Sequence, residues 1–478
     1  MKNIIKSLLL TLIPTILISF SVNAEDVINV GLAYGSSAPA SIHLQGSVFT
    51  QAEGSPVFNN PMISVELPTT MYISAETVNP QDVSPVYVSE YGIYALYTDT
   101  VPEGAVASQL GVPAIRVVEN GQLRAIVSFS QGVAFRDDND GVLEYDSREY
   151  RGELVLHPSP DGAIVVVNRL DVESYLCGVL PYEMSTGWPL EALKAQAVAA
   201  RNYVANNIGK HRSNGFDLCN TTHCQVYRGK TGEAEDCTQA VLDTAGVYLY
   251  YDGKPAQTFY FSSSGGRTEN VKDVWGSSFP YLVSVEDTYE KTEEIPSANW
   301  QYTLSTAALT EKVSNYKIGT VKDVVITSTT DGGRAKTLSI SGTSGIKQLK
   351  ATDFRSLIGA SAIKGTFFTI EKSSNEKIVA ISASGEKNIG TEVNVICSDA
   401  VEMLSVPSAF LGQNGVFLFE PIYSSFKFVG KGYGHGVGMS QWGARGMAEA
   451  GFTYDQILTH YFTGTELKTE EQDDNGVE

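Results

Sequence analysis

Apolar residues recur at helical spacing near the middle of the chain, in the stretch GVLPYEMSTGWPLEALKAQAVAARNY at residues 178–203. The repeat predicts an amphipathic helix whose apolar stripe is formed by Leu190, Leu193, Ala197, Ala200 and Val204. Pro189 suits the first helical turn and Gly209 is suited to end the helix. Glu191, Lys194 and Arg201 lie off the stripe.

Glu183 stands in a constrained turn just ahead of this helix, between Tyr182 and Met184. Apolar and aromatic neighbours would desolvate its carboxyl group, which raises the pKa and favours a protonated general acid. The nearby helix N-terminus acts in the opposite sense. The alternative interpretation is a solvated glutamate that caps backbone amides.

Alternating patterns predict strands on both sides of this helix. Strands are expected at 27–47, in a hairpin at 150–168 around Pro160-Asp161-Gly162, at 247–251 and 257–262, and in alternation at 378–418. A short helix capped by Asp171 and running through Cys177 should follow the hairpin, and a second helix is expected at 234–244. Residues 87–135 read as a small α+β insertion, and 299–370 as helix, hairpin, helix and strand.

Glycine alternates at 432, 434, 436 and 438 near the C-terminus, within GKGYGHGVGMSQWGARG. In an extended strand this spacing leaves one face without side chains, so either another backbone or a flat sugar ring approaches it. Tyr433 and His435 would occupy the opposite face, and His435 is a candidate site residue because its glycine neighbours give it little packing. Ser440 is expected to cap a helix that Gly451 ends.

A second polar stretch, FYFSSSGGRTENVKDVWG at 259–276, ends a strand with a hydroxyl-rich loop. Ser263 could hydrogen-bond a polyhydroxylated ligand and Arg267 could meet a carboxylate. The alternative is an ordinary Ser/Gly turn, which this segment taken alone favours. No nucleophile-elbow motif surrounds these serines, which argues against a serine hydrolase.

Charge and the N-terminus indicate an exported protein that does not bind nucleic acid. Residues 1–24 combine two lysines with an apolar run and small residues at the end, as in a signal peptide cleaved after Ala24; an uncleaved membrane tether is the alternative. Its removal takes two lysines and no acids, so the net charge falls from −20 to −22. This negative net charge opposes binding to a polyanion such as a nucleic acid.

Five cysteines argue against a scaffold stapled by disulfides. Cys177, Cys237 and Cys397 are expected as buried thiols. Cys219 and Cys224 differ, because His223 adjoins the second and His211 precedes the first, a set that suits structural zinc. A disulfide, two free thiols or a catalytic zinc are the alternatives, and adjacent His223 and Cys224 make an awkward ligand pair.

Three segments together, at 178–204, 260–287 and 428–467, resemble the stage II sporulation protein D family, also called SpoIID/LytB. The resemblance implies a lytic transglycosylase that cleaves peptidoglycan glycan strands stripped of stem peptides. Glu183 would be the catalytic acid, and Cys219 and Cys224 would take part in a zinc loop. Other members of the family are named as enhancers of a wall amidase, which leaves glycan binding without catalysis as the rival function.

One carboxylate suffices for lytic cleavage, whereas a glycoside hydrolase generally needs two. Glu173 and Asp287 are the candidates for a second carboxylate beside Glu183. Zinc would then be structural, with no cofactor needed for catalysis. The expected partners are glycan strands and a wall amidase, and the expected location is the cell wall or the space around a forespore. Candidate glycan contacts are Arg201, Ser263, Arg267, Tyr433, His435 and Gln441.

The expected fold is α+β, with helices and antiparallel sheets in two lobes that flank a glycan-binding cleft. The expected division of the chain is a signal peptide at 1–24, N-terminal strands with the insertion at 25–147, a catalytic region at 148–467 with a second lobe at 299–372, and an acidic tail at 468–478.

Overall fold

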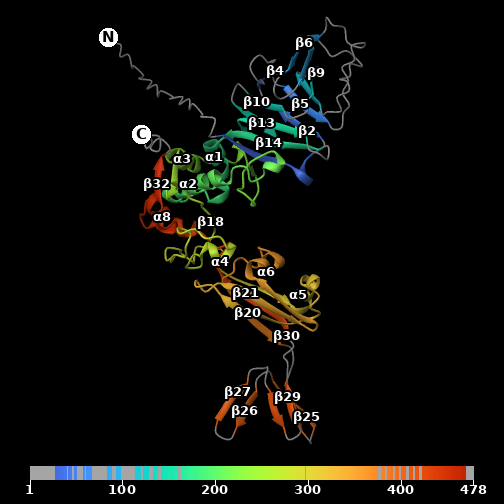
Figure 1. Ribbon diagram of the computed structural model, residues 1–478, viewed down its shortest axis with the longest axis vertical. Coiled ribbons are helices and arrows are strands. Elements are labelled where there is room, and N and C mark those ends of the chain that lie inside the picture. Colours follow the sequence, from blue (N-terminus) through green and yellow to red (C-terminus); the bar gives the residue numbers. More distant parts are fainter. Residues whose placement is uncertain are drawn as a thin grey trace, which may run out of the picture. The chain divides into compact units, whose positions relative to one another are not determined.

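A computed structural model provides the structure of the chain (Figure 1). It describes residues 27–39, 134–137, 141–157, 163–296, 298–374 and 423–469 with their side chains. Between 41 and 137, and between 378 and 418, it describes the backbone of strands. The expected signal peptide, the side chain of Cys397 and the end of the acidic tail lie outside these residues.

The chain divides into two compact units. The first contains the residues up to Tyr175 together with Gly209–Cys224 and Gly229–Thr231. The second contains Leu176–Ile208, Gln225–Arg228 and the residues from Gly232 onward. Both mix strands and helices or short helical turns, and most strand pairs are antiparallel, which confirms the α+β class.

Two sheets make up most of the first unit. The seven-stranded sheet has the order β15 (Leu218–Cys219), β1 (Val27–Ala33), β14 (Ile164–Asp171), β13 (Glu153–Pro158), β10 (Val133–Asp137), β3 (Val48–Thr50) and β4 (Phe58–Asn59). The eight-stranded sheet has the order β12 (Arg148–Arg151), β11 (Val142–Tyr145), β2 (Ser41–Gln45), β5 (Pro61–Glu66), β8 (Ala114–Glu119), β9 (Gln122–Ser128), β7 (Ile93–Tyr97) and β6 (Val83–Val88). The predicted hairpin is the antiparallel pair β13 and β14. The helix expected within the insertion falls on residues outside the described part.

Helix α2 (Leu190–Asn207) is the central element of the second unit. It contacts α3 (Glu235–Asp243), α7 (Gln441–Glu449), α8 (Tyr454–Tyr461) and β16 (Val247–Tyr251), so elements distant in sequence gather around it (Figure 1). These neighbours bury most of its circumference, from Ala192 to Val204. The helix is therefore an interior element rather than the one-sided surface helix that the stripe alone suggests.

Helix α1 (Val172–Glu183) is longer than expected and places Glu183 at its last residue, not in a turn. Asp171 caps the start as predicted, since its Oδ1 accepts a hydrogen bond of 2.8 Å from the N–H of Ser174. A carboxyl group at a helix C-terminus faces the negative end of the helix dipole, which favours the protonated acid.

Residues 299–374 and 423–431 share a separate hydrophobic core with Phe354, Phe426 and Phe428 at its centre. Its strands are β19 (Asn299–Ser305), β20 (Val321–Thr329), β21 (Ala335–Gly342), β22 (Gly345–Lys350), β23 (Phe368–Ser374) and β30 (Tyr423–Lys431), and its helices are α5 (Thr306–Lys312) and α6 (Ala351–Ile358). The expected order of helix, hairpin, helix and strand is confirmed, with β19 and β22 as additional strands. Between 378 and 418 the backbone forms three hairpins: β24 (Ile378–Ser382) with β25 (Gly385–Gly390), β26 (Val393–Cys397) with β27 (Ala400–Leu404), and β28 (Ala409–Gly412) with β29 (Gly415–Leu418).

The remaining short elements of the second unit are α4 (Val271–Trp275), β17 (Lys254–Pro255), β18 (Tyr260–Phe261), β31 (Met439–Ser440) and β32 (Glu466–Thr469). No helix among the described residues is long and apolar enough to cross a bilayer.

Candidate active site

Glu183 is half-buried, and three donors reach its carboxyl group. They are the backbone N–H of Val226 and the side chains of Gln441 and Tyr260. Desolvation raises the pKa of Glu183 to about 7, even though the three hydrogen bonds pull the pKa down. A carboxyl group with this pKa can give and take a proton near neutral pH, as general acid and base catalysis requires.

Tyr260 and Gln441 come from segments that pair with each other. Strand β18, which carries Tyr260, runs parallel to β31, and the next residue after β31 is Gln441. Ser440 caps α7 as predicted, because its Oγ accepts a hydrogen bond of 3.1 Å from the N–H of Gly443. Gln225 also supports Tyr260 with a hydrogen bond of 3.0 Å to its hydroxyl.

The glycine-rich segment is not the extended strand expected from its alternation. All four glycines have positive φ, between 72° and 118°, which side-chain-bearing residues rarely adopt. At Gly438 a Cβ atom would also lie 2.1 Å from the backbone oxygen of Phe259. Another backbone therefore lies against Gly432 and Gly438, whereas the side chains of Phe261 and Arg334 lie against Gly434 and Gly436.

His435 sits among aromatic rings rather than being loosely packed. Its ring centroid lies 4.9 Å from that of Trp275 and 5.4 Å from that of Phe261. Nδ1 accepts a hydrogen bond of 3.1 Å from the N–H of Val437, and the ring also bonds the carbonyl of Tyr260. Burial, with Arg355 and Arg334 nearby, lowers the pKa of His435 to about 4, so the imidazole is neutral at physiological pH.

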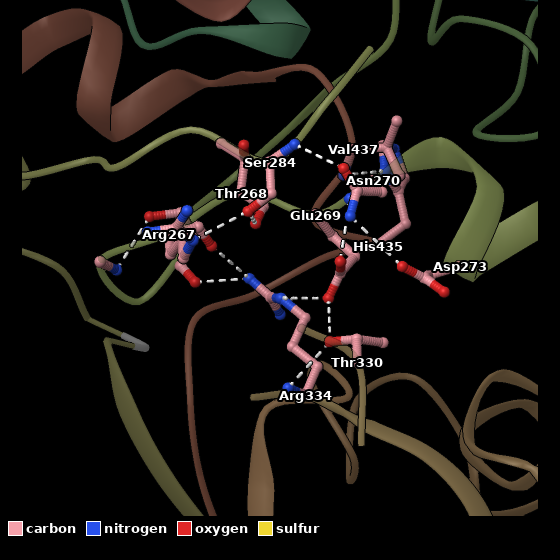
Figure 2. Close-up of polar contacts among 12 residues, drawn as sticks. Arg267, Thr268, Glu269, Asn270, Asp273, Ser284, Thr330, Arg334, His435 and Val437 are labelled. Atoms are coloured by element: carbon pink, nitrogen blue, oxygen red, sulfur yellow. Dashed lines mark hydrogen bonds and ion pairs between the residues drawn. The ribbon is translucent and has the colours of Figure 1, made fainter. Parts of the chain in front are cut away.

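A buried ion pair joins the Ser/Gly loop to the hairpin β20–β21 (Figure 2). The Arg334 guanidinium lies 3.9 Å from the Glu269 carboxylate and donates to the carbonyls of Ser264 at 2.6 Å and Arg267 at 3.0 Å. Thr330 donates to Glu269 at 2.5 Å. The pair is almost fully buried, so its loss would leave an uncompensated charge in the interior.

The Cys/His loop of the first unit brings four metal-binding side chains together: His211, Cys219, His223 and Cys224. His211 Nε2 lies 3.3 Å from His223 Nδ1 and 3.4 Å from Cys224 Sγ, and His223 Nδ1 lies 3.7 Å from Cys219 Sγ. In tetrahedral zinc sites the ligand atoms are roughly 3.3–3.8 Å apart, so these separations fit the ion. The described cysteines are all free thiols, and Cys177 and Cys237 are buried as expected.

Burial raises the pKa of the Cys219 thiol, but hydrogen bonds with Thr221, His223 and Tyr34 outweigh burial and lower the pKa to about 6. The thiolate form, which is the metal ligand, is therefore favoured at Cys219. His223 takes part despite its position next to Cys224, because its Nδ1 lies within 3.7 Å of both sulfur atoms.

Comparison with known proteins identifies the family. Residues 160–251 match the SpoIID family, described as stage II sporulation protein. A Brachyspira hyodysenteriae protein named as uncharacterised is 31% identical over 390 residues, which cover 80% of this chain and 90% of that protein. The chain belongs to the stage II sporulation protein D family.

Two further relatives of this family carry functional names. An amidase enhancer of Bacillus subtilis (strain 168) is 31% identical over 342 residues, or 61% of this chain and 40% of that protein. A stage II sporulation protein D of Bacillus amyloliquefaciens is 29% identical over 360 residues, or 70% of this chain and 88% of that protein.

The other candidate glycan contacts differ in their exposure and in their bonding partners. Gln441 reaches Glu183, and Tyr433 is 37% exposed beneath the ammonium group of Lys364. Arg267 pairs with Glu286 and Ser284 at the surface. Ser263 is buried and donates to Glu290, whereas Arg201 is fully buried and donates to the carbonyls of Val247 and Val241.

Arg201 and Ser263 are both buried and bonded within the protein, so neither side chain is exposed to a glycan strand. Arg201 lies off the predicted stripe, but α3 and β16 cover that side of α2, which a single-helix pattern cannot reveal. Asp287 is buried against Tyr461, and no acidic side chain of the described residues contributes to the pKa of Glu183.

Sequence reasoning missed Tyr260, Glu269, Glu290 and Arg334. Tyr260 and Glu269 lie within the polar stretch at 259–276, and this position was the available signal. Arg334 and Glu290 have no local signal, because their partners lie far away in the sequence.

We predict that Arg334→Met lowers the free energy of unfolding by about 3–5 kcal/mol, because Glu269 is left as a buried unpaired charge. The matched control is Arg267→Met, which removes a surface ion pair worth about 1 kcal/mol or less. Urea denaturation followed by circular dichroism measures both. Equal losses in the two variants would contradict the structural role assigned to Arg334.

Proposed function

We propose that this protein is a lytic transglycosylase of peptidoglycan glycan strands with Glu183 as general acid and base. The observation that carries the proposal is the Glu183 carboxyl group, which has a pKa of about 7 and is held by three donors, while none of the groups that shift its pKa is a carboxylate. The family membership and the relatives' names support a role in the cell wall during sporulation.

The chemistry proceeds in two proton transfers at Glu183. The protonated carboxyl group donates to the glycosidic oxygen, and the bond between that oxygen and the muramyl C1 breaks. The C6 hydroxyl of the same muramyl residue then attacks C1 and returns its proton to the carboxylate, which leaves a 1,6-anhydro end. Val226, Tyr260 and Gln441 stabilise the carboxylate formed between the two transfers.

Two exposed aromatic side chains, in the segments that also carry Tyr260 and Gln441, are suited to sugar rings. Trp275 is 44% exposed and lies against His435, whose ring bonds the carbonyl of Tyr260. Tyr433, two positions before His435, is also exposed, and Nζ of Lys364 lies 5.4 Å from the centroid of its ring. Flat apolar faces with polar edges offer stacking to pyranose rings, and the ammonium group supplies a cation for the muramyl carboxylate.

We predict that Glu183→Gln abolishes cleavage of peptide-stripped glycan, with a loss of at least about 100-fold, and leaves glycan binding within about twofold. Wild-type turnover should fall as pH rises through about 7, because the acid loses its proton there. Fragment release and co-sedimentation with the same glycan measure the two properties, and Glu173→Gln is the matched control. Turnover by Glu183→Gln at the wild-type rate would rule out the assigned acid.

A non-catalytic enhancer of a wall amidase is the second candidate function, and a relative named amidase enhancer favours it. This function predicts that wild type and Glu183→Gln bind glycan equally, that neither cleaves it, and that both stimulate the amidase.

We further propose that the Cys/His loop holds a structural zinc ion through His211, Cys219, His223 and Cys224. Four protein ligands fill a tetrahedral site, which leaves no open position for water. Val226 follows Cys224 by two residues, so an ion that fixes Cys224 also restrains the N–H donated to Glu183.

Purified protein should therefore contain about one zinc per chain, and Cys219→Ser combined with Cys224→Ser should remove it. Chelation should lower the midpoint of thermal unfolding by roughly 5 °C, because the loop loses its cross-link. Metal analysis and calorimetry make the test, with Cys237→Ala as the control. Loss of turnover without any change in the unfolding midpoint would instead indicate a catalytic zinc.

A further inference from the structure

Glu290 lies where two segments of the candidate active site meet, and its carboxylate accepts four hydrogen bonds. Oε2 accepts from the hydroxyl of Ser263 at 3.1 Å and the N–H of Gly265 at 3.0 Å. Oε1 accepts from the N–H of Ser264 at 2.5 Å and the hydroxyl of Ser440 at 2.6 Å. One side chain thus fastens the Ser/Gly loop to the first turn of α7.

Each fastened segment carries a donor to Glu183. The loop at 262–265 follows β18, which contains Tyr260, and Ser440 immediately precedes Gln441. The segments also pair through their backbones, since Trp442 donates from its N–H to the carbonyl of Ser262 at 3.1 Å. The side chain of Glu290 reinforces this pairing next to the two donors.

A second acid, Asp287, lies beside this arrangement and is 1% exposed. Its Oδ1 accepts from the hydroxyl of Tyr461 at 2.9 Å, and its Oδ2 has no partner among the described residues. Burial, and then the charge of Glu290, raises the pKa of Asp287 to about 7. Below that pH the Asp287 carboxyl group is neutral. The charge of Glu290 also acts on Arg334, whose pKa it raises against the larger, opposite effect of burial.

We propose that Glu290 is a positioning residue for the general acid: it holds the Ser/Gly loop against the start of α7, and so keeps Tyr260 and Gln441 on the Glu183 carboxyl group. The inference rests on the proposed function in treating Glu183 as the acid. Glu290 itself touches no reacting atom.

The consequence can be measured at Glu183. Hydrogen bonds from Tyr260 and Gln441 stabilise its carboxylate form, so their loss raises its pKa further. Glu290→Gln keeps the size of the side chain but places an amide NH₂ group against backbone N–H and hydroxyl donors. A donor then faces a donor, and the four-bond arrangement cannot form in full.

The experiment is carboxyl ¹³C NMR titration of the full chain labelled selectively at glutamate, with Glu183 assigned by its absence in Glu183→Gln. In Glu290→Gln the pKa of Glu183 should rise by about one unit. On peptide-stripped glycan kcat should fall about tenfold with little change in KM, and the alkaline limb of the pH profile should move upward. Glu293→Gln, an exposed neighbour, is the matched control and should leave all three unchanged.

A folded Glu290→Gln variant with wild-type titration of Glu183 would overturn the inference, as would a lower kcat without a shifted pH profile, since both describe a purely structural residue. Should Glu290→Gln fail to fold, Ser440→Ala removes one of the four bonds and must shift the titration in the same direction. If wild type does not cleave glycan but Glu290→Gln still shifts Glu183, the proposed function fails and the positioning role stands.

Discussion

The candidate active site depends on one carboxyl group, that of Glu183, which is kept out of water and has no charged partner among the described residues. Desolvation alone would hold Glu183 protonated, and three hydrogen-bond donors counteract desolvation enough to leave the pKa near 7. The donors come from three separate stretches, around Val226, Tyr260 and Gln441. The pKa of Glu183 therefore depends on how those three stretches are placed relative to one another.

That placement depends on close backbone contacts and on buried charged side chains that bond the same segments. The Ser/Gly loop and the glycine-rich segment approach each other closely, and at Gly432 a Cβ atom would lie 2.8 Å from the backbone oxygen of Ser263. Arg334 with Glu269 fixes the far side of the loop, and Glu290 fixes the near side to α7. Buried ion pairs are costly to form, but breaking one costs more, so they favour a single arrangement of these segments.

The sequence predicted the parts of this site that have local signatures. The helix at 190–207, the cap at Ser440 and the pairing of the hairpin that ends at Asp171 follow from periodicity and capping chemistry. The metal-binding set followed from residue types that suit one ion. Glu183 was expected in a turn, whereas α1 continues through Pro181 and ends at Glu183.

Features that depend on distant neighbours could not be predicted. Arg201 looked exposed because a helical stripe does not report which other elements cover the helix. The alternating glycines suggested a strand, whereas all four have positive φ angles and lie against atoms of distant segments. Glu290 and Arg334 have no local signal for the same reason, since their side chains bond residues 25 to 150 positions away.

The most direct test of a one-carboxylate mechanism is the origin of the new chain end. Peptide-stripped glycan digested by wild type in ¹⁸O-labelled water should yield anhydro-muramyl ends that contain no ¹⁸O by mass spectrometry, because the muramyl C6 hydroxyl is the nucleophile. Reducing muramyl ends that carry one ¹⁸O atom would contradict the account, since water would then be the nucleophile and a second catalytic group would have to activate it.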